Sequence, residues 1–186
     1  MNEFALDLER IRAAAREHIE AGPVTAAYRL DVSRTIAVLN EVLATELVCV
    51  LRYKRHYYTA QGVHGPAVAA EFHEHAEDEQ RHADLVAERI TQLGGDPDFS
   101  PDVLAGRSHT QYSPGTDLPD MIREDLVAER IAVATYAEIA RWLGDDDPTT
   151  RRLIEQLLAE EEEHADDLRS LLVRVGTDGS AADGMA

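Results

Sequence analysis

Hydrophobic residues recur every three or four positions over four long stretches of the chain, which is the spacing of an α-helix with one buried face. These stretches cover about residues 32–60, 66–93, 119–143 and 148–175. Three of them open with a proline, Pro66, Pro119 or Pro148, and proline is well tolerated in the first turn of a helix. The pattern predicts an all-α protein with four long amphipathic helices.

The connections between these stretches differ in length, and that difference predicts the topology. The first pair of helices and the second pair are each joined by a short turn, so the members of each pair should lie antiparallel. Residues 94–118 are rich in Gly, Pro, Ser and Asp and show no sustained period. At roughly 3.3 Å per residue, such a segment can follow the whole length of a helix of roughly 42 Å. The sequence predicts a four-helix bundle with one long crossover.

Two segments are expected outside the bundle. Residues 1–30 contain a short amphipathic stretch, about Glu3–Ala21, which stops at Gly22-Pro23 and is expected to form an additional N-terminal helix. Residues 177–186 are small and polar and are expected to be a disordered tail. The predicted organisation is an N-terminal extension over 1–30, the bundle over 31–176 and the tail over 177–186.

Composition agrees with one acidic helical domain and excludes several classes of partner. The chain has 186 residues, 44% of them hydrophobic, which is enough for the core of one domain. Its 36 acidic and 18 basic residues give a net charge of -18, which repels nucleic acids and anionic membranes and attracts cations. No signal peptide or membrane-spanning segment is expected, and the lone Cys49 cannot form an internal disulfide. We expect a cytoplasmic protein.

One short motif occurs twice, as "EQRHADL" and as "EEEHADDL". It places Glu79 three residues before His82, and Glu161 three residues before His164. Residues three apart share one face of a helix, so each pair can bind one ion. Both glutamates fall within apolar stripes, where a carboxylate is costly unless it is paired or bound to a metal.

The other two long helices carry matching residues. Glu46 and Glu129 each lie in an apolar stripe, and each is followed seven residues later by a tyrosine, Tyr53 or Tyr136. The distance to the next Glu-x-x-His is 33 residues in the first half of the chain and 32 in the second. The chain therefore repeats a two-helix unit, which predicts a bundle with pseudo-twofold symmetry and the inward groups near its axis.

The charge of these inward groups predicts a dinuclear metal site. Four glutamates carry four negative charges, which two divalent cations cancel. Mixed carboxylate and imidazole ligands suit iron or manganese, and zinc can compete by affinity. Two adjacent ions can share the electrons of dioxygen or peroxide, so redox chemistry is the expected function. Tyr53 and Tyr136 could orient ligands, transfer an electron, or only pack.

These residues resemble the ferritin superfamily, most closely the bacterioferritins and the bacterioferritin-like members of the Dps-like group, over about Val32–Val175. The di-iron pattern of that family is one Glu from the first helix, Glu-x-x-His from the second, one Glu from the third and Glu-x-x-His from the fourth. The matching metal ligands here are Glu46, Glu79, His82, Glu129, Glu161 and His164. The resemblance implies a ferroxidase that oxidises Fe(II) with O2 or H2O2, binds two iron ions per subunit, and stores and detoxifies iron as Fe(III) in a hollow homo-oligomeric shell of 12 or 24 subunits.

The sequence departs from this pattern in several ways. Gln80 stands where bacterioferritins have their haem-ligating methionine, so we do not expect haem. Rubrerythrins carry an extra carboxylate one turn after Glu129, where this chain has Ala132. A rubrerythrin-like peroxidase or a manganese-catalase-like enzyme without mineral storage is therefore the alternative. A bundle whose polar core is only structural and binds no metal is the alternative from another class.

Three further residues lie near the predicted centre. His75 is interpreted as a surface histidine, in preference to a group that supports the ligands or binds iron on its way in. His56 fits equally a bacterioferritin iron ligand and a solvated helix end. Cys49 is interpreted as a small packed residue in preference to a ligand.

Overall fold

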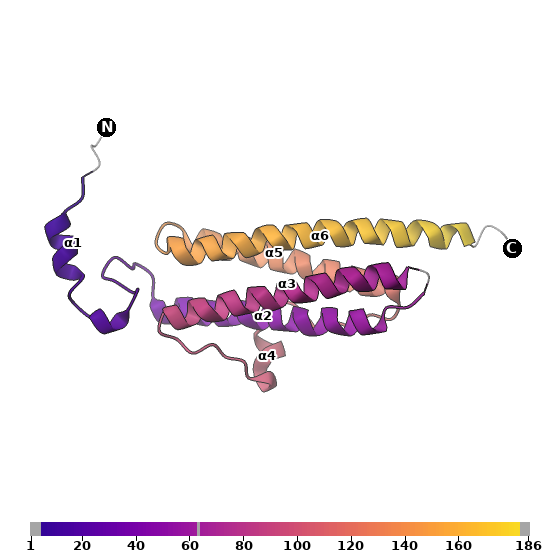
Figure 1. Cartoon of the computed structure of the whole chain (residues 1–186), viewed down its shortest axis with the longest axis horizontal. Helices are drawn as coiled ribbons and strands as arrows, with labels where there is room; N and C mark the ends of the chain where they lie inside the picture. The colour runs from indigo at the N-terminus through magenta and orange to yellow at the C-terminus, as the bar shows by residue number, and fades with distance from the viewer. Residues whose placement is uncertain (1–4, 63, 183–186) are drawn as a thin grey trace.

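The computed structural model describes residues 5–62 and 64–182 of the chain (Figure 1). Its four long helices are α2 (Val32–Thr59), α3 (Gly65–Gln92), α5 (Leu118–Leu143) and α6 (Pro148–Ala182). α2 packs along α3 and α5 packs along α6, and the two pairs meet through α2–α5 and α3–α6 contacts. The predicted all-α four-helix bundle is confirmed.

Aspartates start three of the long helices. The side chains of Asp31, Asp117 and Asp147 each accept a hydrogen bond from the backbone N–H three residues further on. This bond satisfies one of the N–H groups that the first turn of a helix leaves unpaired. Pro148 is the first residue of α6, as the Asp-Pro pair predicts.

The crossover between α3 and α5 follows α2 from one end of the bundle to the other, as expected. Three α2 residues bind it in the order in which the chain passes them. The hydrogen bonds join Asp98 N–H to Asn40 Oδ1 (2.8 Å), His109 N–H to Thr45 Oγ1 (2.9 Å), and Arg52 Nη1 to the Gln111 carbonyl (3.3 Å). The crossover is therefore an ordered strap held along the bundle by side chains of one helix.

The crossover also contains a short helix, α4 (Pro101–Arg107), that the periodicity did not predict. Seven residues are too few for an apolar stripe to be recognised. The local signal is Ser100 followed by Pro101 and Asp102, a typical helix start. Figure 1 shows α4 beside the bundle, and its contacts are with α2.

The ends of the chain differ from the prediction. The additional N-terminal helix is confirmed, but it is shorter than the expected Glu3–Ala21: the described part contains α1 (Leu8–Ala14) and a separate 3₁₀ turn, η1 (Ile19–Ala21), while Glu3 lies outside the described residues. His18, between them, has φ 50°, a left-handed conformation that interrupts a helix. Figure 1 shows α1 standing away from the bundle.

The last helix is longer than the sequence predicts. We expect an end near Val175, but α6 continues to Ala182. Each residue added to a formed helix gains one backbone hydrogen bond. A glycine lowers the stability of the helix by only about 1 kcal/mol, so glycines alone do not end it. The remaining part of the expected tail, residues 183–186, lies outside the described residues.

The core consists of two apolar clusters with a polar layer between them. One cluster gathers Leu39, Val42, Leu43, Val86, Ile90, Leu143, Ile154 and Leu157, and the other gathers Val68, Phe72, Ile122, Leu168 and Leu171. On every long helix, the residues between the two clusters include the candidate ligands.

Within the described residues, no helix is long and apolar enough to cross a membrane.

Candidate metal centre

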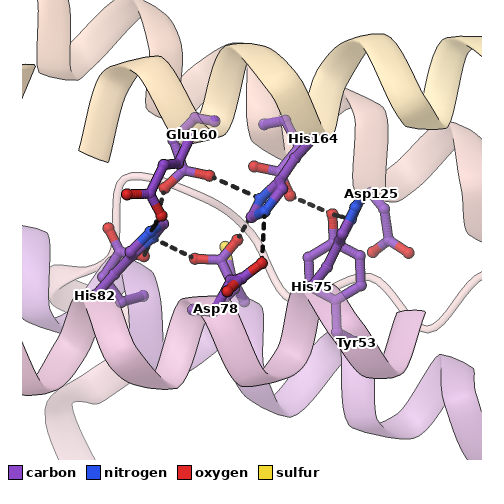
Figure 2. A network of polar contacts seen from close by, with 12 residues as sticks. Tyr53, His75, Asp78, His82, Asp125, Glu160 and His164 are labelled. Atoms are coloured by element: carbon purple, nitrogen blue, oxygen red, sulfur yellow. Dashed lines mark hydrogen bonds and ion pairs between the residues drawn. The ribbon is translucent and has the colours of Figure 1, made fainter. Parts of the chain in front are cut away.

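Six acidic and histidine side chains from the four long helices meet in the polar layer. They are Glu46 from α2, Glu79 and His82 from α3, Glu129 from α5, and Glu161 and His164 from α6, and none is more than 4% exposed. Figure 2 shows both histidines in the space between α3 and α6. The structure thus brings together all six residues that the sequence singled out.

The six residues form two overlapping sets of four. One set is Glu46, Glu79, His82 and Glu161, and the other is Glu79, Glu129, Glu161 and His164. In each set, one ligand atom from every residue lies within 4.8 Å of the others. Glu79 and Glu161 belong to both sets, which is the arrangement of two metal positions that share bridging carboxylates.

The spacing between donor atoms suits metal ions. Nδ1 of His82 lies 3.5 Å from Glu46 Oε2, 3.7 Å from Glu79 Oε2 and 3.3 Å from Glu161 Oε1. Nδ1 of His164 lies 3.5 Å from Glu79 Oε1 and 3.3 Å from Glu161 Oε2. Two donors bound at about 2.1 Å to one ion lie about 3.0–3.4 Å apart. The donor atoms are therefore spaced much as the ligands of one bound ion are.

The inward atoms of this centre have no hydrogen-bond partner within the described part of the chain. They are Glu46 Oε2, both oxygens of Glu79, His82 Nδ1, Glu129 Oε2, both oxygens of Glu161 and His164 Nδ1. Leaving one buried polar atom unpaired costs about 1–3 kcal/mol, and more when the group is charged. Such a concentration of unpaired donors around one point is expected where metal ions bind.

The two tyrosines hold the glutamates at the ends of the centre. Tyr53, on α2, donates a hydrogen bond to Glu129 Oε1 on α5, and Tyr136, on α5, donates one to Glu46 Oε1 on α2. Each tyrosine therefore orients the glutamate of the opposite half and leaves the other carboxylate oxygen directed inward. This geometry agrees with the ligand-orienting role among the alternatives that the sequence left open.

Two further carboxylates orient the histidines. Nε2 of His82 lies 2.8 Å from Glu160 Oε2, and Nε2 of His164 lies 3.4 Å from Asp78 Oδ2 (Figure 2). A carboxylate on Nε2 favours a proton there and leaves the Nδ1 lone pair for a metal. Neither Glu160 nor Asp78 is predicted from the sequence to support a ligand. The sequence feature that could identify them is an acidic residue directly before each shared glutamate, as in Asp78-Glu79 and Glu160-Glu161.

Proton binding in the metal-free centre follows from burial and crowding. Burial raises the pKa of Glu46 and of Glu129 well above the usual value, and neighbouring carboxylates add to the effect. Burial also opposes ionisation of Glu79, but the nearby Glu46 and the two histidines favour its charged form and hold its pKa well below the usual value. Burial alone would lower the pKa of His164, but the carboxylates of Glu161 and Glu79, 3.3 and 3.5 Å from Nδ1, outweigh burial and raise that pKa to about 11. Without metal, the centre holds protons that divalent ions would displace.

The three additional residues near the centre are all buried. The surface interpretation of His75 is wrong, because this residue is only 2% exposed. A solvated position for His56 is also wrong: its Nδ1 lies 2.8 Å from Asp125 Oδ2 and its Nε2 lies 3.1 Å from the Pro114 carbonyl. Cys49 is packed in the core, with Sγ 3.4 Å from Arg52 Nη2.

Comparisons with known proteins agree with this fold and this donor set. The ferritin-like domain family matches residues 36–176. The structure described as a dodecameric thioferritin, the bacterioferritin-related protein of Bacteroides fragilis, is 33% identical, with a TM-score of 0.78 over 82% of this chain and 92% of that one. A bacterioferritin of Desulfovibrio desulfuricans is 30% identical over 71% of this chain and 70% of that protein. A nutrient stress-induced DNA-binding protein of a Nostoc species is 31% identical over 78% of this chain and 82% of that protein.

Proposed function

This chain belongs to the ferritin-like domain family, and from that premise we propose that it is a ferroxidase that stores and detoxifies iron. Its substrate is Fe(II), which it oxidises at the centre enclosed by the four helices of one subunit. The observation that carries the proposal is the pair of overlapping Glu and His sets, whose inward atoms are buried and unpaired.

The overall reaction balances for a pair of iron ions. Each Fe(II) gives up one electron and becomes Fe(III), and O2 takes up the two electrons and two protons to leave as H2O2. With H2O2 as the oxidant, the same two electrons and two protons yield two molecules of water. The four glutamate charges match two Fe(II) ions and stabilise the further positive charge of Fe(III).

The residues of the chain have separate tasks in this reaction. Glu79 and Glu161 bridge the two ions and hold them close enough to react together. Glu46 with His82, and Glu129 with His164, complete one position each. Protons on the metal-free centre leave as Fe(II) binds, so iron uptake should release acid.

We also propose that the subunits form a hollow homo-oligomeric shell in which Fe(III) accumulates. A dodecamer is the favoured size, because the Bacteroides fragilis protein described as dodecameric is 33% identical and shares the fold over 92% of its length. The net charge of -18 raises the local concentration of Fe(II) at the surface of such a shell.

Replacing a bridging carboxylate tests the proposal. The variants Glu79→Ala and Glu161→Ala should abolish rapid Fe(II) oxidation, measured by absorbance after anaerobic Fe(II) is mixed with O2. Both variants should remain folded, so that the loss of oxidation reports the loss of a ligand. Thermal unfolding of the metal-free variants checks that each still unfolds in one cooperative transition. Glu163→Ala, an exposed position on α6, is the matched control and should oxidise Fe(II) normally.

Two results would contradict the proposal. One is a Glu79→Ala protein that oxidises Fe(II) at the wild-type rate. The other is a small particle by light scattering that turns over H2O2 without accumulating iron, which would favour a peroxidase.

A further inference from the structure

A third group of potential ligands lies beside the centre, on the side where α3 faces α6. It consists of Glu71, His75 and Asp167, and one ligand atom from each lies within 4.8 Å of the other two. These residues line a pocket of about 490 Å³ whose wall also includes His164. The pocket therefore connects the surface of the bundle to a residue of the di-metal centre.

The hydrogen bonds of Tyr53 determine which nitrogen of His75 carries a proton. Tyr53 has one hydroxyl proton, which it donates to Glu129. Nδ1 of His75 lies 3.2 Å from the same hydroxyl oxygen, so in this contact Nδ1 must donate and the tyrosine oxygen must accept. In a neutral imidazole, the lone pair is then on Nε2.

The lone pair of His75 faces the pocket and its carboxylates. Nε2 lies 3.8 Å from Glu71 Oε1, too far for a hydrogen bond, and no other described residue hydrogen-bonds to it. The imidazole is 98% buried and stacks on the His164 ring, with ring centroids 4.0 Å apart. A lone pair beside two carboxylates repels them unless a cation lies between.

The basic side chain of the pocket, Arg81, does not neutralise the carboxylates beside His75, because it binds other acidic residues. Arg81 binds Asp78 and Glu160, both at 2.7 Å, at the His82 side of the pocket. Burial raises the pKa of Glu71, and Asp167 and Glu74 raise it further, while Arg174 and His164 offset only part of this effect. The residues around His75 thus retain an excess of negative charge.

We propose that Glu71, His75 and Asp167 bind a third divalent metal ion, separate from the two ions of the central site. Two carboxylates and one neutral imidazole suit Fe(II), Mn(II) or Zn(II). The ion would lie between the pocket opening and His164. A role in passing Fe(II) to the centre rests on the proposed function, whereas binding of the ion does not.

Zinc binding to the metal-free, full-length protein tests this site, because Zn(II) is not oxidised and needs no activity. The double variant Glu71→Gln/Asp167→Asn should bind one zinc fewer per chain than the wild type by isothermal titration. Glu163→Gln changes another carboxylate of the same pocket and should bind as many zinc ions as the wild type. In crystals soaked with zinc, the anomalous map should contain a peak among Glu71, His75 and Asp167 that the double variant lacks.

The proposal is overturned if the wild type and the double variant bind the same number of zinc ions, or if the map has no peak at these three residues. The Glu79→Ala variant separates this outcome from failure of the proposed function, because it should lose zinc from the centre and keep the peak at His75. If the site passes iron inward, the double variant should also oxidise limiting Fe(II) about tenfold more slowly at an unchanged maximal rate. An unchanged rate would overturn that role alone.

Discussion

Tyr53 and Tyr136 connect opposite halves of the bundle through the glutamates that they orient. Removing one hydroxyl leaves a buried carboxylate oxygen without its donor, so Tyr53→Phe and Tyr136→Phe should each destabilise the metal-free protein by about 1–3 kcal/mol. Zinc affinity at the centre should fall about 10- to 100-fold, as for other residues that support metal ligands. Urea unfolding and zinc titration measure the two effects. Tyr58→Phe, at a tyrosine that is 80% exposed, should change neither.

The titration of the centre predicts how stability depends on pH. The pKa of His164 is about 11 in the folded protein, against an ordinary value of 6.5. Its contribution to the free energy of unfolding is therefore complete below pH 6.5 and is lost as the pH rises toward 11. The pKa values of Glu46 and Glu129 are raised in the folded protein, so above about pH 4.5 the folded state keeps protons that the unfolded state has lost. This difference also makes the folded state less stable as the pH rises. The lowered pKa of Glu79 adds a stabilising contribution to the free energy of unfolding, and this contribution does not change with pH above about pH 4.5.

The metal-free protein should therefore become less stable between pH 6.5 and about pH 9, because its unfolded state binds fewer protons there. Zinc-loaded protein should change less over the same window, since metal ions take the place of those protons. Calorimetric unfolding at several pH values, with and without zinc, measures the difference. A metal-free midpoint that rises with pH across this window would show that the assignment of protons is wrong.

At the level of single residues, the sequence predicts the centre well because each inward residue obeys a local rule. Glu-x-x-His places two donors on one helical face, and an apolar stripe shows that the face is buried. Asp78, Glu160 and the burial of His75 depend instead on which residues of α6 stand opposite α3. That pairing is set by packing between helices, which the period of one helix does not contain.

Among the structural elements, the crossover is held by a buried ionic network. Asp125 Oδ1 lies 2.7 Å from Arg52 Nε and Oδ2 lies 2.8 Å from His56 Nδ1, and all three side chains are fully buried. Arg52 and His56 also bind backbone carbonyls of the crossover. The network therefore joins α2, α5 and the strap that runs between the two helix pairs.

Breaking this network should loosen the strap. Asp125→Asn leaves the Arg52 guanidinium buried without its counter-charge and should cost about 3–5 kcal/mol in urea unfolding. The double variant Arg52→Met/Asp125→Leu should recover much of that loss, because it removes both charges. Glu124→Gln, at the adjacent and partly exposed position, is the control and should change little. Equal stability of Asp125→Asn and wild type would show that the network is not structural.

The elements differ in how far sequence predicts them. The four long helices follow from sustained periodicity and capping residues, which predict each end to within one residue except the C-terminal end of α6. α4 is too short to show a period, and the interruption at His18 depends on one backbone conformation. The length of α6 depends on how far a formed helix extends through glycines, which periodicity does not measure.

For the whole molecule, α1 and η1 stand apart from the bundle, whereas the residues that follow them pack against it. The helical residues of α1 and η1 include no buried side chain, whereas Val24, Tyr28 and Leu30 pack against the core and Tyr28 hydrogen-bonds to Asp147. Deleting residues 1–22 should leave the unfolding midpoint and the Fe(II) oxidation rate almost unchanged. Deleting residues 1–30 should lower the midpoint, because it uncovers apolar surface and removes that hydrogen bond. Similar losses in both deletions would contradict this division.

Assembly is the level that a single chain predicts least. Contacts between subunits involve surface residues whose pattern resembles any solvated helix face, so neither the sequence nor one subunit fixes the number of copies. The exposed Leu6, Leu8, Ile11 and Ile19 of the N-terminal segment are the apolar residues that a neighbouring subunit would have to cover. Light scattering of the two deletion proteins measures whether that segment contributes to the size of the particle.

The repeated two-helix unit supplies both metal positions with equivalent ligands, but their surroundings differ. The His82 side chain is completely buried and lies 2.8 Å from Glu160, whereas His164 is 4% exposed, stacks on His75 and lines the acidic pocket. An ion that arrives through this pocket meets His164 before it can reach His82. We therefore expect ions that enter through this pocket to fill the His164 position before the His82 position.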